Sequence, residues 1–288
     1  MHSLRYFLSA FLLIISLNLS SQTYVSGVLT SDDFWEPEGS PYIITDSLVV
    51  APEAILSINA GTVVMFRYHP DPAKKSYMKV NGGIRIFGNQ EVRVYFTSER
   101  DDSFGDLNGD GNATIPRPGD WGYVELNCPN PLGNEYYLGW THFRYGGGRN
   151  PDTIASRDFY PMVSFPDEIM NERDMVDVYG CRFEYSRGVG IRMGKAYVNV
   201  STVTNCRNGI LITSSNCALV NSYITGNSGY PICFDGLTMG MNSQDDGARS
   251  FFIEDFAENF ITDNGQNYFA IGGDVRSVLG DYVAMPVV

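Results

Sequence analysis

Four stretches of the chain share one pattern: CRFEYSRGVGI (residues 181–191), VTNCRNGI (203–210), ITGNSGYPI (224–232) and ITDNGQNYFAI (261–271). Each passes from an apolar residue through a polar turn and a small residue into a second apolar segment. Equivalent positions are 20 residues apart from Phe183 to Val203 and 21 apart from Val203 to Ile224. This period is typical of one coil of a parallel β-helix. The sequence therefore predicts an all-β solenoid, a right-handed parallel β-helix.

The composition also favours strands and turns. The chain holds 30 Gly, 18 Tyr and 17 Phe, and its apolar residues rarely recur at the three- and four-residue spacing of a helix. We expect Phe183, Val203, Ile224 and Ile261 to point inward, the first three on successive coils. Two longer gaps, 143–183 and 224–261, predict either projecting loops or coils that have lost the pattern.

Asparagine recurs in the polar turns. An Asn side chain can bond the backbone of its own turn and the Asn of the next coil, and it tolerates a left-handed backbone. We expect a ladder of Asn205, Asn227 and Asn264, with Ser186 in the first position, although Asn205 stands one place out of register.

A further set of segments precedes the repeats: DFWEPEGSPYIIT (33–45), LVVAPEAILSINAGTVVMF (48–66), VNGGIRIFG (80–88), VYFTS (94–98) and GDWG (119–122). These resemble the opening coils of bacterial secreted right-handed β-helix proteins of the pectate-lyase-like fold. The resemblance covers about residues 27–127 well and the later coils more loosely. It implies the fold and little about chemistry, because that fold serves many functions.

The first residues predict export. Arg5 precedes an apolar run from Phe7 to Leu17 that is too short to span a bilayer, and small residues follow it. We expect a signal peptide over 1–21 and one secreted or cell-surface β-helix domain over 22–288, without a membrane span; a retained anchor is the alternative. The apolar end, 280–288, carries no cap pattern, which predicts a truncated β-helix or a final coil covered by another subunit or domain.

The chain is acidic, with a net charge of −13, or 19 − 33 = −14 without the leader. Such a charge repels nucleic acid and anionic lipid, so neither is an expected partner. It supplies oxygen ligands for calcium, or it serves solubility alone.

The segment DLNGDGN (106–112) is the sharpest local motif, because oxygen ligands alternate around a glycine bend as in the first half of a calcium loop. Arg117 stands where the EF-hand pattern requires a bidentate Glu, so Asp101, Asp102 or Asp120 would have to close the site. A plain surface turn is the alternative. The candidate calcium ligands are Asp106, Asn108, Asp110, Asn112 and Asp120.

Five cysteines, none in a CxxC pair, predict buried core residues ahead of a disulfide framework: Cys128, Cys181, Cys206, Cys217 and Cys233. With only His69 and His142 after the leader, serine or zinc hydrolase chemistry has no support. Charged residues in or near strands are either catalytic groups or a solvated face: Arg144, Arg182, Arg192, Lys195, Asp177, Glu184 and Asp235.

Aromatic residues cluster at Tyr136, Tyr137, Trp140, Phe143 and Tyr145, where they either stack on sugar rings or fill the core. The function expected first is a calcium-stabilised scaffold for adhesion or glycan contact. The alternatives are a polysaccharide lyase or glycoside hydrolase of the same fold and a passive structural spacer. A bare aromatic strip would favour the binder, an Arg or Lys beside calcium ligands would favour the lyase, and an acidic pair in a groove would favour the hydrolase.

Overall fold

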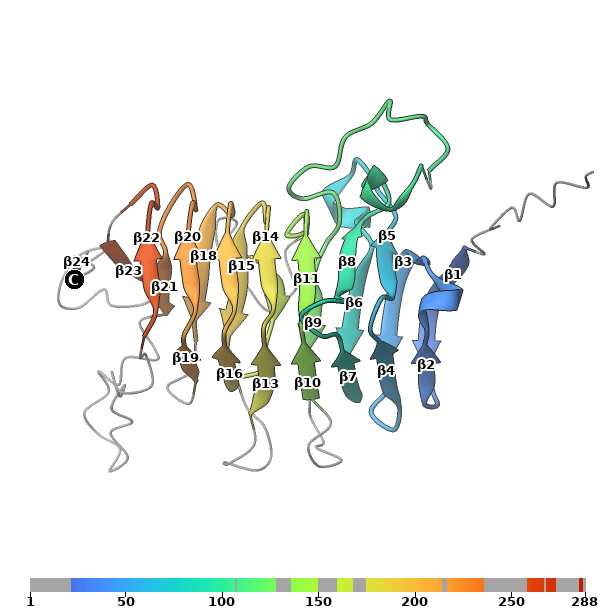
Figure 1. Ribbon diagram of the computed structural model, residues 1–288, viewed down its shortest axis with the longest axis horizontal. Helices are drawn as coiled ribbons and strands as arrows, with labels where there is room; N and C mark the ends of the chain where they lie inside the picture. Colours follow the sequence, from blue (N-terminus) through green and yellow to red (C-terminus); the bar gives the residue numbers. More distant parts are fainter. Residues whose placement is uncertain are drawn as a thin grey trace, which may run out of the picture.

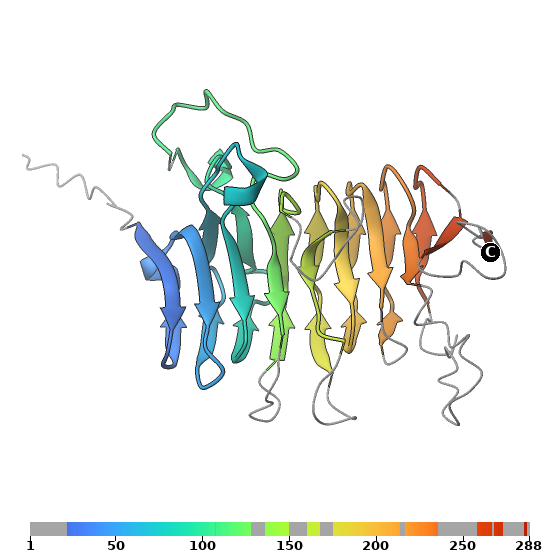
Figure 2. The ribbon, with the colours of Figure 1, turned by 180° about the vertical axis from the view of Figure 1, so that it is seen from behind.

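A computed structural model describes residues 22–106, 108–127, 136–149, 160–167, 175–213, 217–235, 258–266, 268–272 and 285–286. The chain winds into an elongated solenoid in which the strands of each coil stack in parallel on those of the next (Figures 1 and 2). The predicted parallel β-helix is therefore confirmed. The predicted signal peptide, residues 1–21, lies outside the described residues. Within the described ranges, no helix is long and apolar enough to cross a membrane.

Each complete coil contributes one strand to each of three ladders. The first sheet contains β5 (Val63–Phe66), β8 (Val94–Ser98), β11 (Thr141–Arg144), β14 (Arg182–Glu184), β17 (Thr202–Thr204), β20 (Tyr223–Thr225) and β22 (Phe260–Thr262). The second sheet contains β6 (Tyr77–Val80), β9 (Val124–Leu126), β12 (Pro161–Ser164), β15 (Val189–Met193), β18 (Asn208–Ile212), β21 (Ile232–Asp235) and β23 (Tyr268–Gly272). The third sheet contains β2 (Asp33–Trp35), β4 (Ile55–Asn59), β7 (Gly83–Phe87), β10 (Tyr136–Gly139), β13 (Val176–Tyr179), β16 (Ala196–Asn199) and β19 (Ala218–Val220).

The first coils join two of these sheets. Strands β1 (Thr23–Leu29) and β3 (Tyr42–Val50) pair along their whole length, and β3 then pairs with β5 and with β6. At the other end, β24 (Met285–Pro286) pairs antiparallel with β23. Three short 3-10 helices lie in turns: η1 (Pro37–Gly39), η2 (Pro72–Lys74) and η3 (Asp102–Phe104).

The core is one continuous column of apolar side chains. Phe183 pairs with Val203, Val203 with Ile224, and Ile224 with Ile261. The first three are at most 1 % exposed, and Ile261 is partly buried against the same core. The inward positions and successive coils predicted from the 20- and 21-residue spacing are thus confirmed, and Ile261 follows directly after Ile224.

The two longer gaps have different contents. The first gap carries strands β12 and β13, so the coil continues through it. Most of the second gap, residues 236–257, lies outside the described residues. Four of the five cysteines are buried and form no disulfide, as expected of core residues: Cys181, Cys206, Cys217 and Cys233. Cys128 lies outside the described residues.

A side-chain ladder runs along the corner between the first and second sheets. The backbone N–H of Ser186 donates to Sγ of Cys206 (3.5 Å), that of Cys206 donates to Oδ1 of Asn227 (3.0 Å), and that of Asn227 donates to Oδ1 of Asn264 (3.1 Å). Asn205 is not a member, so the prediction was wrong for that residue. Asn205 lies one residue before the ladder position, where the backbone of each turn takes the left-handed conformation (φ 54° for Asn205). Its side chain is exposed.

A second ladder, not expected from the sequence, follows the corner between the third and first sheets. Cys181 N–H donates to Oγ of Ser201 (3.1 Å), Ser201 N–H to Oγ of Ser222 (3.1 Å), and Ser222 N–H to Oδ1 of Asn259 (2.9 Å). Both corners therefore satisfy buried backbone donors with short polar or sulfur side chains of the next coil.

The first ladder yields a stability prediction. Asn227→Ala should lower the free energy of unfolding by about 1–3 kcal/mol, because the buried N–H of Cys206 loses its acceptor. Asn205→Gly is the matched control, since glycine accepts the left-handed conformation, and it should change stability by less than about 0.5 kcal/mol. Urea denaturation measures both variants. Equal losses would show that the ladder has no special role.

Candidate functional site

The outer surface of the third sheet carries a strip of exposed aromatic rings. Phe87 of β7, Tyr179 of β13 and Tyr197 of β16 are 45 %, 38 % and 38 % exposed, and Tyr137 of β10 is half-buried between them. We call these four residues the aromatic strip. They lie on neighbouring strands, because β7, β10, β13 and β16 follow one another in the sheet.

The rings of the strip alternate between two rows of the sheet. Tyr137, Asp177 and Tyr197 share one row, and Phe87, Gly139 and Tyr179 share the other. The Phe87 and Tyr137 ring centroids are 6.1 Å apart. A Cβ on Gly139 would stand 2.6 Å from the Tyr137 hydroxyl, so the Tyr137 side chain lies over this glycine. The four rings therefore zigzag across two rows of the sheet, with Asp177 between Tyr137 and Tyr197.

Polar groups border the strip. Arg85 pairs in register with Tyr137, Asp177 lies between Tyr137 and Tyr197, and Asn199 donates to the Tyr197 hydroxyl (3.3 Å). Burial raises the pKa of Asp177. The strip therefore combines exposed ring faces with hydrogen-bonding groups along its border.

The aromatic cluster identified in the sequence is divided among three environments. Phe143 lies in the core and Tyr136 is buried. Trp140 lies at the corner after β10, where its ring contacts Tyr179 (5.8 Å between centroids), and Tyr145 stacks on Tyr185 (5.2 Å). Only Tyr137 joins the strip. The sequence analysis missed the other strip residues. Buried and exposed residues alternate along β13, so the inward position of Val178 would have predicted that Tyr179 faces outward.

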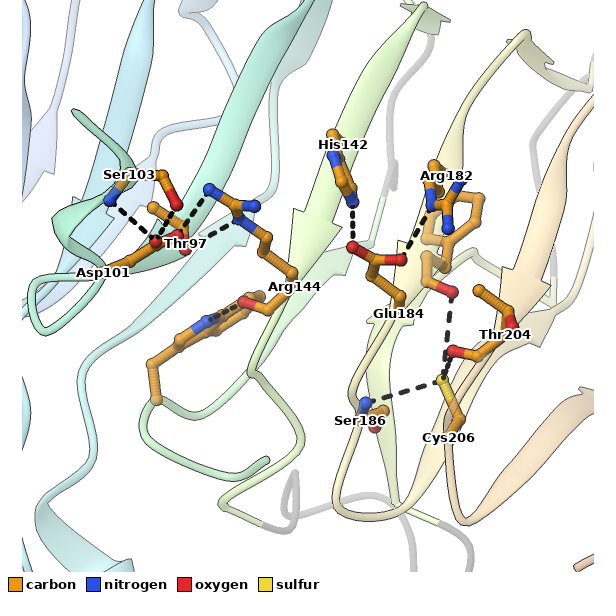
Figure 3. A network of polar contacts seen from close by, with 12 residues as sticks. Thr97, Asp101, Ser103, His142, Arg144, Arg182, Glu184, Ser186, Thr204 and Cys206 are labelled. Carbon is orange, nitrogen blue, oxygen red and sulfur yellow. Dashed lines mark hydrogen bonds and ion pairs between the residues drawn. The ribbon is translucent and has the colours of Figure 1, made fainter. Parts of the chain in front are cut away.

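The outer surface of the first sheet carries a different set of groups, shown in Figure 3. Nε2 of His142 lies 2.7 Å from Oε1 of Glu184, and Nε of Arg182 donates to Oε2 of the same carboxylate at 2.7 Å. His142 comes from β11, whereas Arg182 and Glu184 come from β14, the next strand of the sheet. Glu184 is thus held on both of its oxygens.

The electrostatics of this group are those of an ion pair. Burial alone would raise the pKa of Glu184, but its hydrogen bonds and the charges around it, from His142 and Arg182, lower it to about 2. Burial lowers the pKa of His142, against the opposing effect of Glu184. At neutral pH, an ionised Glu184 therefore accepts from Arg182 and from a neutral imidazole protonated on Nε2.

A second ion pair lies one strand further toward the N-terminus. Nη2 of Arg144 is 2.6 Å from Oδ2 of Asp101, which also accepts from the Thr97 hydroxyl (2.5 Å). Oδ1 of Asp101 accepts from the hydroxyl of Ser103 (2.7 Å). These bonds tie the start of the projecting segment between β8 and β9 to the outer surface of the first sheet (Figure 3).

The projecting segment returns to the core at Trp121. This indole is fully buried, stacks on Phe66 (4.1 Å between centroids), and donates from Nε1 to the Arg144 carbonyl (2.8 Å). The GDWG motif of 119–122 therefore anchors the loop that carries the candidate calcium ligands.

The loop brings together three of the five candidate ligands. The two carboxylate oxygens of Asp106 accept from the backbone N–H groups of Asp110 and Gly111, each at 2.9 Å. Oδ1 of Asn108 also accepts from the Asp110 N–H (3.1 Å). Asn112 is exposed with a left-handed backbone (φ 69°).

Asp120 lies apart from that loop. It is 3 % exposed, and its carboxylate accepts from Ser98 Oγ (2.9 Å) and from the Arg117 N–H (3.0 Å) and pairs with Arg100 (3.3 Å). Of the three residues named as candidates to close the loop, Asp101 and Asp120 are thus engaged elsewhere. Asp102 is not: Oδ1 is buried without a hydrogen-bond partner, and partial burial together with the charges of Asp110 and Asp106 raises its pKa.

In the described part of the chain, no three acidic, histidine or cysteine side chains are grouped closely enough to hold a metal ion. The remaining charged candidates are dispersed. Arg192 pairs with Asp167 and donates to Ser164 (3.2 Å), and Lys195 is buried. The Asp235 side chain lies outside the described set.

The His142 group yields a prediction with opposite signs for its two partners. Glu184→Gln should lower the pKa of His142 further, because the carboxylate favours the imidazolium form, and Arg182→Gln should raise it. An NMR titration of the His142 Cε1 proton measures both shifts. Two shifts of the same sign would contradict this account of the charges.

Comparison of the chain with protein families, with curated proteins and with solved structures finds no match. The parallel β-helix fold rests on the strand pairing in the structure itself.

Proposed function

We propose that the chain is an exported or cell-surface β-helix that contacts glycans without cleaving them. The observation that supports this most directly is the aromatic strip of Phe87, Tyr137, Tyr179 and Tyr197 on the third sheet. Sugar rings present flat CH faces, and an exposed tyrosine offers them a large apolar surface with little loss of side-chain entropy.

The geometry of the strip suits an extended ligand. Parallel strands lie about 4.8 Å apart, so rings on four neighbouring strands follow one another along the solenoid axis, alternating between two rows. The sheet fixes their relative positions before a ligand arrives, which reduces the entropy lost on binding. An oligosaccharide chain aligned with the axis would meet several rings in turn.

The charged groups favour a binder over a hydrolase. A glycosidase needs a carboxylic acid that holds a proton near neutral pH. The pKa of Glu184 is about 2, and both of its oxygens are engaged, so Glu184 does not suit that role. Asp177 lies between Tyr137 and Tyr197, where its carboxyl group can form a hydrogen bond with a sugar hydroxyl.

The strip is tested with a panel of polysaccharides and the purified chain. Tyr179→Ala with Tyr197→Ala should weaken binding to the preferred glycan by about tenfold or more, since each stacked ring contributes roughly 1 kcal/mol. Tyr223→Ala is the matched control, because Tyr223 is 49 % exposed but lies on the first sheet. Calorimetry measures affinity, and assays for reducing ends and unsaturated products should stay negative. Product formation, or equal effects of the variants, would refute the proposal.

We also propose that calcium stabilises the loop after η3. Asp106, Asn108 and Asp110 supply three side chains, and the buried, unpartnered Oδ1 of Asp102 is the group that a cation would satisfy. Calcium takes six to eight oxygen ligands, so backbone carbonyls and water would complete the shell. The stabilisation would act on the projecting loop, which the anchored Trp121 joins to the core.

Removing calcium with a chelator should lower the melting temperature, because a ligand that binds only the folded state stabilises it by mass action. Asp110→Ala should abolish that calcium dependence. Asp46→Ala, an exposed acidic residue on β3, is the control and should retain it. Asp120→Ala should destabilise the chain with or without calcium, because it removes the partner of Arg100. If the melting temperature of the unmodified chain is the same with and without calcium, the site is excluded.

A further inference from the structure

Lys75 carries a buried amine in the turn between β5 and β6. This residue follows η2 directly and is 4 % exposed, whereas its neighbour Lys74 is exposed. In both ribbon views the turn lies beside the projecting segment between β8 and β9 (Figures 1 and 2). Among the described residues, no carboxylate lies within ion-pair distance of Lys75 Nζ and no hydrogen bond engages it. A lysine that is buried without such a partner is rare, which makes Lys75 a candidate for chemistry.

The other lysines of the chain have ordinary environments. The sequence holds four, and Lys74 is the exposed one in the same turn. Lys79 pairs with Glu125 at 3.6 Å, and Lys195 is buried with an interaction partner. Lys75 therefore differs from all three in the described part of the chain.

The Lys75 amine lies among two guanidinium groups, one carboxylate and an aromatic ring. Its Nζ is 4.4 Å from the centroid of the Tyr68 ring, and Cζ of Arg100 is 4.5 Å from the same centroid. Burial lowers the pKa of Lys75, and the charge of Asp120 opposes this effect. The charges of Arg187 and Arg100 lower the pKa further. The amine therefore gives up its proton more readily than an exposed lysine, and a neutral amine is a nucleophile.

The two arginines can accept a further anion. Nη1 of Arg100 pairs with Asp120 (3.3 Å), but Nε of Arg100 is buried without a hydrogen-bond partner. The stem of Arg187 lies against the end of the projecting segment, because a Cβ on Gly119 would stand 2.7 Å from its Cδ. A negative group at Lys75 would therefore offer an acceptor to a buried donor that lacks one.

The charges of the cluster favour the same addition. With a neutral Lys75, the two positive charges of Arg100 and Arg187 face the single negative charge of Asp120. A protonated Lys75 makes the excess larger. One carboxylate added to the amine would give two positive and two negative charges, and such a balance is favourable where burial weakens solvent screening.

We propose that Lys75 is a carbamate site, at which carbon dioxide adds to the side-chain amine and joins the turn between β5 and β6 to the projecting segment. The neutral nitrogen attacks the carbon of carbon dioxide, and an N–C bond forms as one C–O π bond breaks. One N–H proton passes to water. The carbamate anion then accepts from Nε of Arg100 and from the guanidinium of Arg187. This modification is independent of both glycan contact and calcium binding.

The experiment exposes the purified full chain to bicarbonate labelled with the NMR-active carbon isotope, at mildly alkaline pH, and records the carbon spectrum. A carbamate resonance should appear beside those of bicarbonate and carbon dioxide, and Lys75→Met should remove it. Lys74→Met is the matched control and should keep the signal, because that lysine is exposed one position earlier. Acidification should abolish the signal, since it protonates the amine and releases carbon dioxide.

A second measurement locates the group without any variant of Lys75. An alkyl oxonium salt converts the carbamate into a stable ester, and peptide mass spectrometry of the unmodified chain should then find that ester on Lys75. The test therefore does not depend on the folding of Lys75→Met.

The role of the guanidinium groups is tested separately. Arg187→Gln should require about threefold or more carbon dioxide for half occupancy, because a positive charge that favours the carbamate is lost. Arg182→Gln is the control and should match the unmodified chain, because Arg182 pairs with Glu184. Absence of a carbamate, its location on another amine, or equal occupancy of the two arginine variants would overturn the proposal.

Discussion

The structure depends on the in-register stacking of each coil on the next. Because the strands pair in parallel without a shift across β14, β17, β20 and β22, each side chain meets the equivalent side chain of the neighbouring coil. Inward positions therefore become apolar columns, and outward positions become rows of rings, charges or hydroxyls. When an exposed residue type such as tyrosine recurs on several stacked coils, it forms a surface that extends along the solenoid.

The corners satisfy the main chain where the sheets turn. In both ladders the backbone N–H of one coil donates to a short side chain of the next, such as Oγ of Ser201 or Oδ1 of Asn227. Cysteine serves in the same position, since Sγ of Cys206 accepts from Ser186. Burial raises the pKa of this thiol to about 12, so it stays protonated and unreactive. The same turns place Arg187 and Arg207 outside the ladder, where both are exposed.

The projecting segment between β8 and β9 is attached both to the outer surface of the first sheet and to the core. Its start is tied to the first sheet through Asp101 and Arg144, and its end is anchored in the core by Trp121. Between these two attachments lie the acidic side chains that would bind calcium, and Gly119 supports the stem of Arg187. An ion bound in the loop would thus stiffen a segment that is already attached to the solenoid at both of its ends.

The sequence by itself determined the solenoid, the coil length and the inward residues, such as Phe183 and Val203. These follow from a local repeat, because one coil of about 20 residues contains all the periodic information that stacking needs. Only the tertiary structure decided which outward residues meet. His142 and Glu184 are 42 residues apart and touch across one strand spacing, while Asn205 and Cys206 differ by one position and face opposite environments. Because the coils differ in length, residues that stack on one another are separated by different numbers of residues in the sequence. The neighbours within the aromatic strip could therefore not be predicted from a local sequence pattern.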